Sequence, residues 1–529
     1  MKNKKIVISI LIVMALAVGV LLSACDGLVG GLGGLGGLEG DVKTVEFYAI
    51  NDFHGEWDKM AQVSGYLSQQ KGSGNVVLLN SGDMFQGSME SNSNYGALLA
   101  ECMDETGFDA FTYGNHEFDW GLDNLRKLAR NSQTPYLGAN IYDWDANTRR
   151  WGELADFAQE YVVKELNNGI KVGIIGVIGK DQITSISSQL VQTIGFKDPK
   201  DIIPDLSEKL REELGCDVVV VSAHTGQDTF LEDNSWDITE YADAVFCAHT
   251  HRSEKTTKNG VPFIQGGSYG NYVSRVTLVV DEQGTVKCKT SDNVSYSSRW
   301  PNKYSVSEKI DNSNASIKDE ANQVLATLNG GNLNSQTAVP RLVSRAIAEY
   351  AKSQYPQYPI DLAMVNNARN SLQKGQITYT ALYEAIPFDN VVYIAKVKGS
   401  DILNEAKYDS NSIWRVSGAK IEYNEYYYIA VIDYLLYHQG TNRTYNYFPS
   451  AFTSGFDPVP LTKEGVVAYN YRLITRDFLL AQGTIAASDY TSVNNRTNKD
   501  LLQQVITLSL IDGATTLLCN ANSQFTLIY

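Results

Sequence analysis

Histidine and acidic side chains gather in five short clusters in the first half of the chain. The clusters are Asn51-Asp52-Phe53-His54, Gly82-Asp83, Gly114-Asn115-His116-Glu117, His224 and His249-Thr250-His251. The protein has six histidines, and all of them except His438, which we interpret as structural, belong to these clusters. Oxygen and imidazole donors without thiolates suit borderline divalent metals such as Mn, Zn, Co or Fe. The clusters therefore predict a divalent-metal site.

The spacing within the clusters favours shared ligation. Asp52 and His54 are two residues apart directly after an apolar run, so both side chains can point the same way, and His249 and His251 repeat this spacing. Each fragment alone is a weak signal, because a lone Asp-x-His or Gly-Asp is more often a turn than a pair of ligands. Together the clusters offer seven donors, which are too many for one ion and fit two ions that share a carboxylate.

The clusters follow short apolar runs of β-branched or aromatic residues. The runs are residues 45–50, 76–79, 110–113, 172–178, 218–221, 244–246 and 262–264. Helical stretches such as 122–130 and 205–214 lie between some of them. Near-continuous apolar strands that alternate with helices predict a sheet buried on both faces. In such folds ligands gather outside the carboxyl ends of the strands, where the polar clusters stand.

Length and charge limit the possible partners. A chain of 529 residues is too long for one ordinary core, so we expect two large domains. The net charge of -16 argues against binding nucleic acid or an anionic membrane through a basic patch. Two dications held by Asp52 and Asp83 would still leave a locally positive site for a small anionic substrate. We expect the protein to be a monomer.

Four motifs carry a family resemblance. Ala49-Ile50-Asn51-Asp52-Phe53-His54, Gly82-Asp83-x-x-x-Gly87, Gly114-Asn115-His116-Glu117-Phe118-Asp119 and Ala248-His249-Thr250-His251 resemble the signatures of the calcineurin-like metallophosphoesterases. The Asn-His-Glu-Phe-Asp motif narrows the resemblance to the bacterial 5'-nucleotidase family, although Ala248 stands where glycine is usual. The resemblance implies an α/β protein whose N-terminal metallophosphoesterase domain has four α/β/β/α layers.

The resemblance also implies roles for individual residues. Two divalent ions, with Mn, Zn or Co expected, are bound by Asp52, His54, Asp83, Asn115, His224, His249 and His251. Asp83 bridges the two ions, and a hydroxide between them attacks phosphorus in line with the leaving group. His116 and Asp119 form the catalytic dyad, in which His116 stabilises the transition state.

Two segments in the rest of the chain resemble the substrate-specificity domain of the same family, and the resemblance fades before the last 30 residues. A helical connector is expected within 301–332, with its helix over 305–327, followed by an α+β domain over 333–529. Arg369, six residues before Gly375, and the motif Pro387-Phe388-Asp389-Asn390 carry this resemblance, and Arg369 is implied to bind substrate. Asn366-Asn367-Ala368 replaces the usual glycines before it, and a surface salt bridge is the alternative role for Arg369.

Three aromatic residues are candidates for stacking on a nucleobase. They are Trp414, Tyr445 and Tyr447, which stand in the stretches that correspond to the family's base-stacking aromatics. The family's Gly-Gly-Asp-Gly sequence before the second aromatic is replaced by Gly440-Thr441-Asn442-Arg443. Aromatic side chains are more often part of the core than of a binding site, so a core position is the alternative.

The N-terminus resembles a bacterial lipoprotein precursor. Lys2, Lys4 and Lys5 precede an apolar run at 6–22, and Leu22-Ser23-Ala24-Cys25 resembles a lipobox. We therefore expect a signal peptide at 1–24, lipidation of Cys25, and a glycine-rich tether at 25–43 before the first domain at 44–300. A transmembrane helix is the alternative, because the apolar run reaches the lower length limit for spanning. One or two disulfides among the other five cysteines are permitted.

These observations predict a lipid-anchored, extracytoplasmic phosphomonoesterase acting on nucleotides, at the periplasmic face or the cell surface. The alternatives within the same chemistry are a 2',3'-cyclic-nucleotide phosphodiesterase and a nucleotide-sugar pyrophosphatase. An inactive surface binding protein is the alternative from another class. It would need a damaged set of metal ligands, and all the ligand and dyad positions are occupied by suitable residues.

Overall fold

The computed structural model describes residues 42–72, 74–407, 411–416, 420–440, 443–464, 466, 469–491, 518–519 and 525–526. The predicted signal peptide, Cys25 and most of the tether lie outside these residues. No helix in the described part combines the length and hydropathy needed to cross a membrane. Cys102, Cys216, Cys247 and Cys288 carry free thiols.

The chain divides into two compact units, one of residues 44–279 with 286–529 and one of residues 1–43 with 280–285. Within the smaller unit, the Asp281 carboxylate accepts hydrogen bonds from the backbone N–H groups of Gln283 and Thr285 and so closes a turn. All the sites described below belong to the larger unit.

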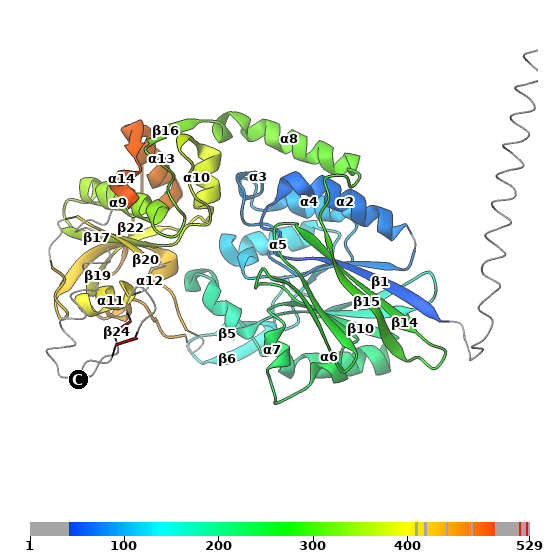
Figure 1. Cartoon of the computed structure of the whole chain (residues 1–529). Helices are drawn as coiled ribbons and strands as arrows, with labels where there is room; N and C mark the ends of the chain where they lie inside the picture. Colours follow the sequence, from blue (N-terminus) through cyan, green and yellow to red (C-terminus); the bar gives the residue numbers. More distant parts are fainter. Residues whose placement is uncertain are drawn as a thin grey trace, which may run out of the picture. The chain divides into compact units, whose positions relative to one another are not determined.

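Two six-stranded sheets form the first half of the larger unit (Figure 1). The first sheet has the order β15-β14-β1-β2-β3-β4 and the second β12-β13-β11-β10-β8-β7. The strands of the first sheet are β1 (Lys43–Ile50), β2 (Val76–Asn80), β3 (Ala110–Thr112), β4 (Tyr136–Leu137), β14 (Tyr272–Val280) and β15 (Val286–Ser295). Those of the second are β7 (Tyr161–Glu165), β8 (Lys171–Ile178), β10 (Val218–His224), β11 (Ala244–Phe246), β12 (Ser253–Lys258) and β13 (Val261–Gly266).

Both sheets are built around parallel strands with buried faces. β1 pairs in parallel with β2, and β10 pairs in parallel with β8 and β11. Every residue of β2 and of β10 is buried, as expected for strands covered on both sides. The sheets face each other, because Phe47 of β1 and Phe246 of β11 approach to 5.8 Å between ring centroids.

Helices cover the outer faces of the two sheets. α2 (Trp57–Lys71) and α4 (Ala97–Thr106) share a buried core with β1 and β2, and α6 (Ile203–Glu208) shares one with β8 and β10 (Figure 1). This arrangement matches the predicted α/β/β/α layers. The remaining α-helices described in this half are α3 (Met89–Asn92), α5 (Leu122–Asn131) and α7 (Asp228–Leu231). A small sheet with the order β6-β5-β9 consists of β5 (Ile141–Asp145), β6 (Arg150–Leu154) and β9 (Ile194–Phe196).

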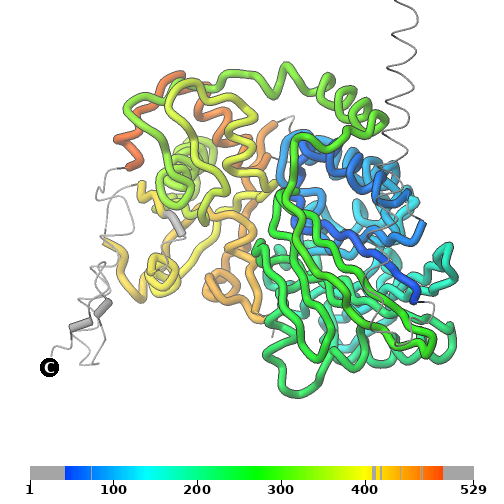
Figure 2. Tube along the Cα trace, turned by 45° about the vertical axis from the view of Figure 1, so that its right-hand side comes forward, coloured from blue at the N-terminus to red at the C-terminus, as the bar shows by residue number. Residues whose placement is uncertain are grey.

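The connector differs from its prediction. Helix α8 (Tyr304–Ala321) begins near the expected point, but residues 324–329 form strand β16 (Val324–Asn329) instead of continuing the helix to 327. β16 pairs with β18 (Gly375–Thr378) and β23 (Thr484–Ala486). The helical prediction for 324–327 was therefore wrong, because these partners are distant in the sequence. Figure 2 follows the chain from β15 through α8 into these elements.

The second half of the larger unit is the expected mixture of helices and strands. A five-stranded sheet has the order β20-β17-β21-β19-β22, and α9 (Ala338–Gln354) packs against it. Its strands are β17 (Ile360–Asn366), β19 (Val392–Lys398), β20 (Asn411–Arg415), β21 (Tyr426–Ile432) and β22 (Val459–Pro460). The other elements are α10 (Tyr379–Ala385), α11 (Gly399–Glu405), α12 (Asp433–Leu436), α13 (Tyr471–Gln482), α14 (Ser488–Thr491), β24 (Leu518–Cys519) and β25 (Phe525–Thr526).

Candidate active site

The predicted metal ligands stand on sharp turns after the strands. Asp52, His54, Asp83, His249 and His251 have left-handed backbones with φ of 47°, 50°, 54°, 73° and 60°. Residues other than glycine rarely adopt such angles. Strained backbone of this kind concentrates at functional sites, where the surrounding structure holds side chains in directions that a relaxed loop would not give.

Glycine is required at two motif positions because atoms of neighbouring loops lie too close for a side chain. A Cβ at position 87 would lie 1.9 Å from the carbonyl oxygen of His54, and a Cβ at position 114 would lie 2.2 Å from Oδ1 of Asp83. Both distances are far inside van der Waals contact. These glycines therefore allow the ligand-bearing loops to pack against each other.

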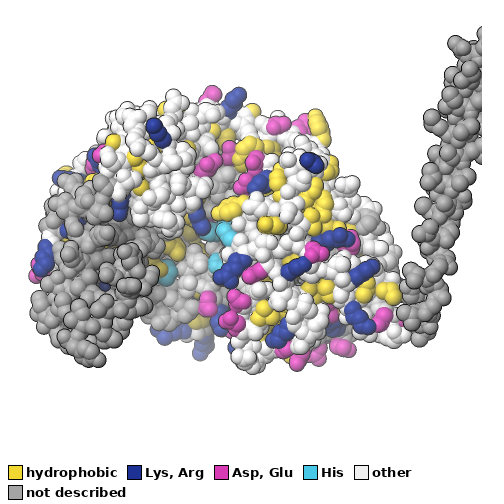
Figure 3. Space-filling view, viewed as in Figure 1, with side chains coloured by type: hydrophobic (Ala, Val, Ile, Leu, Met, Phe, Trp, Pro, Cys, Tyr) yellow, Lys and Arg dark blue, Asp and Glu magenta, His cyan; other side chains and the backbone are white. Residues whose placement is uncertain are grey.

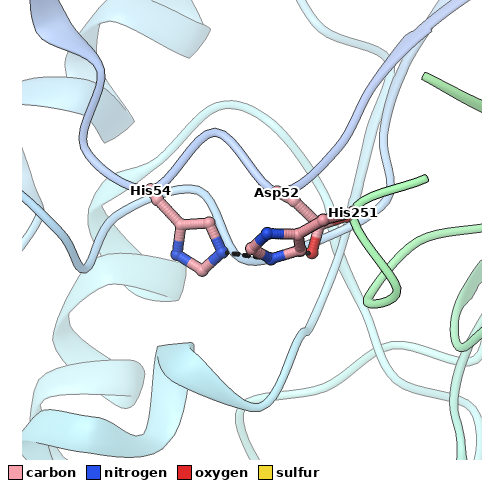
Figure 4. Close-up of side chains that lie close together, drawn as sticks. All are labelled: Asp52, His54 and His251. Carbon is pink, nitrogen blue, oxygen red and sulfur yellow. Dashed lines mark hydrogen bonds and ion pairs between the residues drawn. The ribbon is translucent and has the colours of Figure 1, made fainter. Parts of the chain in front are cut away.

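Asp52, His54 and His251 form the first group of donors (Figure 4). Nε2 of His54 lies 3.0 Å from Nε2 of His251, and Nε2 of His251 lies 3.5 Å from Oδ1 of Asp52. Nδ1 of His54 donates to the carbonyl oxygen of Gln86 at 3.2 Å. In the neutral imidazole this bond leaves Nε2 with a free lone pair that faces the other donors.

Asp83, His224 and His249 form the second group, with Asn115 beside them. Nε2 of His224 lies 3.2 Å from Oδ2 of Asp83 and 3.2 Å from Oδ1 of Asn115. Oδ1 of Asn115 is also 3.0 Å from Nδ1 of His249. The Asp83 carboxylate reaches the first group too, because its Oδ2 lies 3.9 Å from Nε2 of His54. The structure therefore brings all seven predicted ligands together.

The chemistry of the two groups fits divalent cations. Nδ1 of His224 donates to the carbonyl oxygen of Ser81 at 2.8 Å, so the neutral ring turns a lone pair toward two oxygen acceptors. Converging acceptors repel each other unless a proton or a cation lies between them. Although burial opposes it, the Asp83 and Asp52 carboxylates raise the pKa of His224 to about 9. A divalent ion bound by these donors would neutralise the same carboxylates.

Burial also shifts the pKa values of the other predicted ligands in the directions that favour binding of a cation. Burial lowers the pKa of His54 well below its ordinary value and lowers those of His249 and His251 to about 4. Neutral imidazoles are the form that binds metal. Burial also raises the pKa of Asp52 to about 7, so this carboxylate needs a nearby cation to stay ionised at neutral pH.

Two buried residues hold the ligand loops in place. Oε2 of Glu117 accepts from the backbone N–H groups of Asp83 at 2.9 Å and Gly114 at 2.7 Å, while Oε1 accepts from Met84 at 2.9 Å. Nδ2 of Asn51 donates to Oδ2 of Asp52 at 2.6 Å. Both residues belong to the sequence motifs, yet the sequence alone did not indicate these roles.

His116 and Asp119 stand next to the ligands on a 3₁₀ helix, η1 (His116–Trp120). Side chains three residues apart eclipse in such a helix, and Nδ1 of His116 donates to Oδ2 of Asp119 at 2.8 Å. The backbone N–H of His116 donates to Oδ1 of Asp83 at 2.8 Å. Although burial opposes it, the Asp119 and Asp83 carboxylates raise the pKa of His116 above its ordinary value. Nε2, on the other side of the ring, faces Arg369.

Arg369 reaches this dyad. Its Nη2 lies 3.3 Å from Nε2 of His116, and its guanidinium lies 5.1 Å from the ring centroid of Phe388. The Phe388 ring stacks on His116 with centroids 5.4 Å apart. In this structure Arg369 faces the dyad and makes none of the salt bridges seen among the described residues, and its role in substrate binding stays a prediction.

A cavity of about 380 Å³ opens over the dyad, within the usual size range of small-molecule sites. Histidine side chains are visible in a hollow of the surface in Figure 3. The cavity is lined by His116, Asp119, His249 and Arg369 together with Gln86, Asn115, Trp120, Ser185, Ser187, Leu190, Asn366, Asn367, Phe388, Asp389, Asn390, Val391, Asp433 and Tyr434.

Comparisons with known proteins agree with this geometry. Residues 45–253 match the calcineurin-like phosphoesterase family, and residues 324–426 match the 5'-nucleotidase C-terminal domain. Residues 45–253 therefore form a calcineurin-like phosphoesterase domain, and residues 324–426 form a 5'-nucleotidase C-terminal domain. The family uses divalent metals, and the donor groups of this phosphoesterase domain are suited to them.

Individual relatives are distant. The chain is 26% identical over 381 residues to the endonuclease YhcR of Bacillus subtilis, a match that covers 66% of this chain and 30% of that protein. It is 25% identical over 391 residues to a 5'-nucleotidase of Vibrio vulnificus, covering 63% of this chain and 67% of that one. The structure of a 5'-nucleotidase precursor from Thermus thermophilus has the same fold, with a TM-score of 0.69 at 17% identity, covering 86% of this chain and 99% of that one.

The three predicted base-stacking aromatics of the 5'-nucleotidase C-terminal domain do not line the active-site cavity. Trp414 is 6% exposed in the core beside Tyr490. Tyr447 stacks on His438, with centroids 4.1 Å apart. Tyr445 lines a different cavity. Their role in stacking on a nucleobase stays a prediction, and none of the three lines the active-site cavity in this structure.

Further aromatic, acidic and polar residues line the same cavity. Phe388 and Tyr434 supply aromatic surfaces in the cavity, and Asp433 supplies a carboxylate whose pKa is raised to about 7 by burial. Gln86 and Ser187 each line the cavity with a buried polar atom that has no hydrogen-bond partner within the described residues. Phe388 stands in a motif of the sequence, whereas no sequence signal marked Tyr434 or Asp433.

Proposed function

We propose that this protein is a 5'-nucleotidase that hydrolyses nucleotide phosphomonoesters with two divalent metal ions. The observation that carries the proposal is the convergence of two groups of metal donors beside His116 and Arg369. Support for nucleotides as substrates comes from the matching 5'-nucleotidase C-terminal domain and from the name of the Vibrio relative.

The predicted ligands would divide between two ions, with Asp83 contributing to both. Asp52, His54 and His251 would hold one ion, and Asn115, His224 and His249 the other. Bound divalent ions at this position polarise phosphoryl oxygens and activate water for attack on phosphorus. Mn, Zn or Co suits the mixture of imidazole and oxygen donors.

His116 and Arg369 act on the phosphate itself. The bond from Nδ1 to Asp119 fixes the imidazole and directs Nε2 into the cavity. Nε2–H and the Arg369 guanidinium can then donate to one phosphoryl oxygen, because their nitrogens lie 3.3 Å apart. Donors held in place before the reaction stabilise the charge that grows in the transition state.

The nucleoside part would lie against the C-terminal domain. Phe388 and Tyr434 offer faces for a planar base, and Asp433 and Asp389 offer acceptors for hydroxyl or amino groups. Stacking on an aromatic side chain tolerates different bases, so we expect a broad nucleotide range.

We further propose that the protein is lipid-anchored at Cys25 and faces the periplasm or the exterior. Support comes from the basic residues, apolar run and Ser23-Ala24-Cys25 of the N-terminus. Metabolic labelling with palmitate should mark the wild-type protein and leave a Cys25→Ala variant unlabelled. Equal labelling of both proteins would refute the anchor.

The decisive experiment measures phosphate release from AMP after chelation, with and without added Mn²⁺. We expect release only with metal. Activity on 2',3'-cyclic AMP or UDP-glucose with none on AMP would replace the nucleotidase by the corresponding phosphodiesterase or pyrophosphatase. Bound metal without turnover of any ester would contradict the enzymatic proposal and indicate a binding protein.

A further inference from the structure

A second cavity lies apart from the active site and has no role in the proposed reaction. Its volume is about 690 Å³, and none of the residues that line it lines the active-site cavity. We name it the tryptophan pocket and define it by Trp144, Arg149, Trp151, Lys180, Arg443 and Tyr445. The first three come from strands β5 and β6 and the turn between them, whereas Arg443 and Tyr445 come from the C-terminal half of the chain.

The walls of the tryptophan pocket are aromatic. Trp144 and Trp151 face each other across the β5–β6 pair, with centroids 4.9 Å apart and planes at 65°. Trp151 is 44% exposed, although indole rings are among the largest apolar surfaces that a protein can bury. Tyr445 is held by stacking on Phe452 at 3.7 Å. Such rigid, partly open rings are typical of a stacking surface for a planar ligand.

The charge of the pocket is positive in a protein that is strongly acidic overall. The Arg443 guanidinium lies 4.8 Å from the Trp144 ring centroid, and Nη2 donates to the carbonyl oxygen of Ile194 at 2.6 Å. Lys180 is paired with Asp198, so Arg443 and Arg149 carry the remaining positive charge. Asp181 is the one acidic residue among those that line the cavity.

The backbone is shaped to place these groups. Arg149 and Arg443 have left-handed backbones with φ of 54° and 58°, as five of the metal ligands do. A Cβ at Gly195 would lie 2.7 Å from Nη2 of Arg443 and 2.8 Å from Cζ3 of Trp151. Because Gly195 has no side chain, the side chains of Arg443 and Trp151 can both pack against its backbone.

We propose that the tryptophan pocket is a second binding site, for a planar aromatic molecule that carries negative charge, which is the chemistry of a nucleotide. The base stacks on Trp151, and the anionic group lies against Arg443 and Arg149. A site for neutral carbohydrate would need the stacking surface but not the two arginines.

One segment of the chain contributes different residues to the tryptophan pocket and to the active-site cavity. In the segment of residues 180–192, Ser185, Ser187 and Leu190 line the active-site cavity, while Lys180 and Gln192 line the tryptophan pocket. A binding experiment must therefore separate the two sites by variants of each.

Isothermal titration with the phosphonate analogue of AMP, in which a methylene group replaces the ester oxygen, tests the proposal without turnover. We expect two sites in the wild-type protein and one in Trp151→Ala. In Arg149→Ala, whose side chain is exposed, we expect affinity at the second site to fall roughly 10-fold, as for the loss of one close charge pair. Both variants should hydrolyse AMP at the wild-type rate.

Control variants distinguish this result from failure of the proposed function. Tyr304→Ala removes an aromatic ring that is 78% exposed elsewhere and should keep both sites. Arg369→Ala should weaken the active site alone. A single site in the wild type, or a second site that survives both Trp151→Ala and Arg149→Ala, would overturn the proposal, whether or not AMP is a substrate. Tighter binding of a neutral disaccharide than of the analogue would also overturn it.

Discussion

The role of Glu117 leads to a prediction about both metal sites. This carboxylate is 1% exposed and accepts three backbone hydrogen bonds from the loops that carry Asp83 and Asn115. We predict that Glu117→Gln keeps the shape of the side chain but loosens both loops. The amide oxygen can replace Oε2, whereas the amide NH₂ then faces the N–H of Met84 and cannot accept from it.

The magnitude follows from these contacts. Loss of a hydrogen bond to a charged acceptor costs about 1.5–3 kcal/mol, and a buried unpaired N–H adds about 1–3 kcal/mol. A net loss of about 3 kcal/mol would lower the melting temperature of a domain of this size by roughly 6–12 °C. Metal affinity should fall about 10- to 100-fold, as for other residues that orient metal ligands.

Differential scanning calorimetry and metal titration of Glu117→Gln provide the measurements. Glu101→Gln is the matched control, because Glu101 is exposed and pairs with Lys309, and its melting temperature should stay within about 2 °C of the wild type, as expected for an exposed position. Wild-type metal affinity together with an unchanged melting temperature in Glu117→Gln would refute the role assigned to this carboxylate.

Three further substitutions and one ligand removal test other parts of the site. His116→Ala should retain its bound metal, as measured by emission spectroscopy, while kcat for AMP falls about 10²–10⁴-fold. Near-normal turnover would show that His116 has no part in the mechanism. Gly87→Ala forces a Cβ to within 1.9 Å of a carbonyl oxygen and should prevent stable folding. Gly455→Ala is the control, because Gly455 has a φ of 73° and open space where the Cβ would lie. This control should lower the free energy of unfolding by only about 1 kcal/mol. Arg472→Met removes a buried guanidinium that donates to the carbonyl oxygens of residues 386, 387 and 388. The loop that carries Phe388 then loses these hydrogen bonds, so KM for AMP should rise. An unchanged KM would contradict this role of Arg472. Chelation should lower the melting temperature of the protein, and adding Mn²⁺ should raise it again, because the ions bind the folded state alone. A melting temperature that does not respond to metal would contradict the metal site.

The connector and the aromatic residues show where local sequence patterns were insufficient. The residues of β16 follow a helix directly, and their strand form depends on pairing with Gly375–Thr378 and Thr484–Ala486. Trp414 resembles a base-stacking residue by position, yet β20 pairs with β17 and turns this ring into the core beside Tyr490. In both cases the deciding partner lies tens of residues away.

By itself, the sequence determined the family resemblance, the α/β class and a set of candidate metal donors. This was possible because the clusters of donors lie at the ends of apolar strands, and parallel strands bring their carboxyl ends to one edge. The tertiary structure alone decided that Glu117 holds two loops, that Tyr434 enters the active-site cavity, and that Arg443 reaches the tryptophans of β5 and β6. These contacts join segments more than thirty residues apart, and in the last case several hundred. Such contacts depend on how whole elements pack, and no local spacing of residue types encodes that packing.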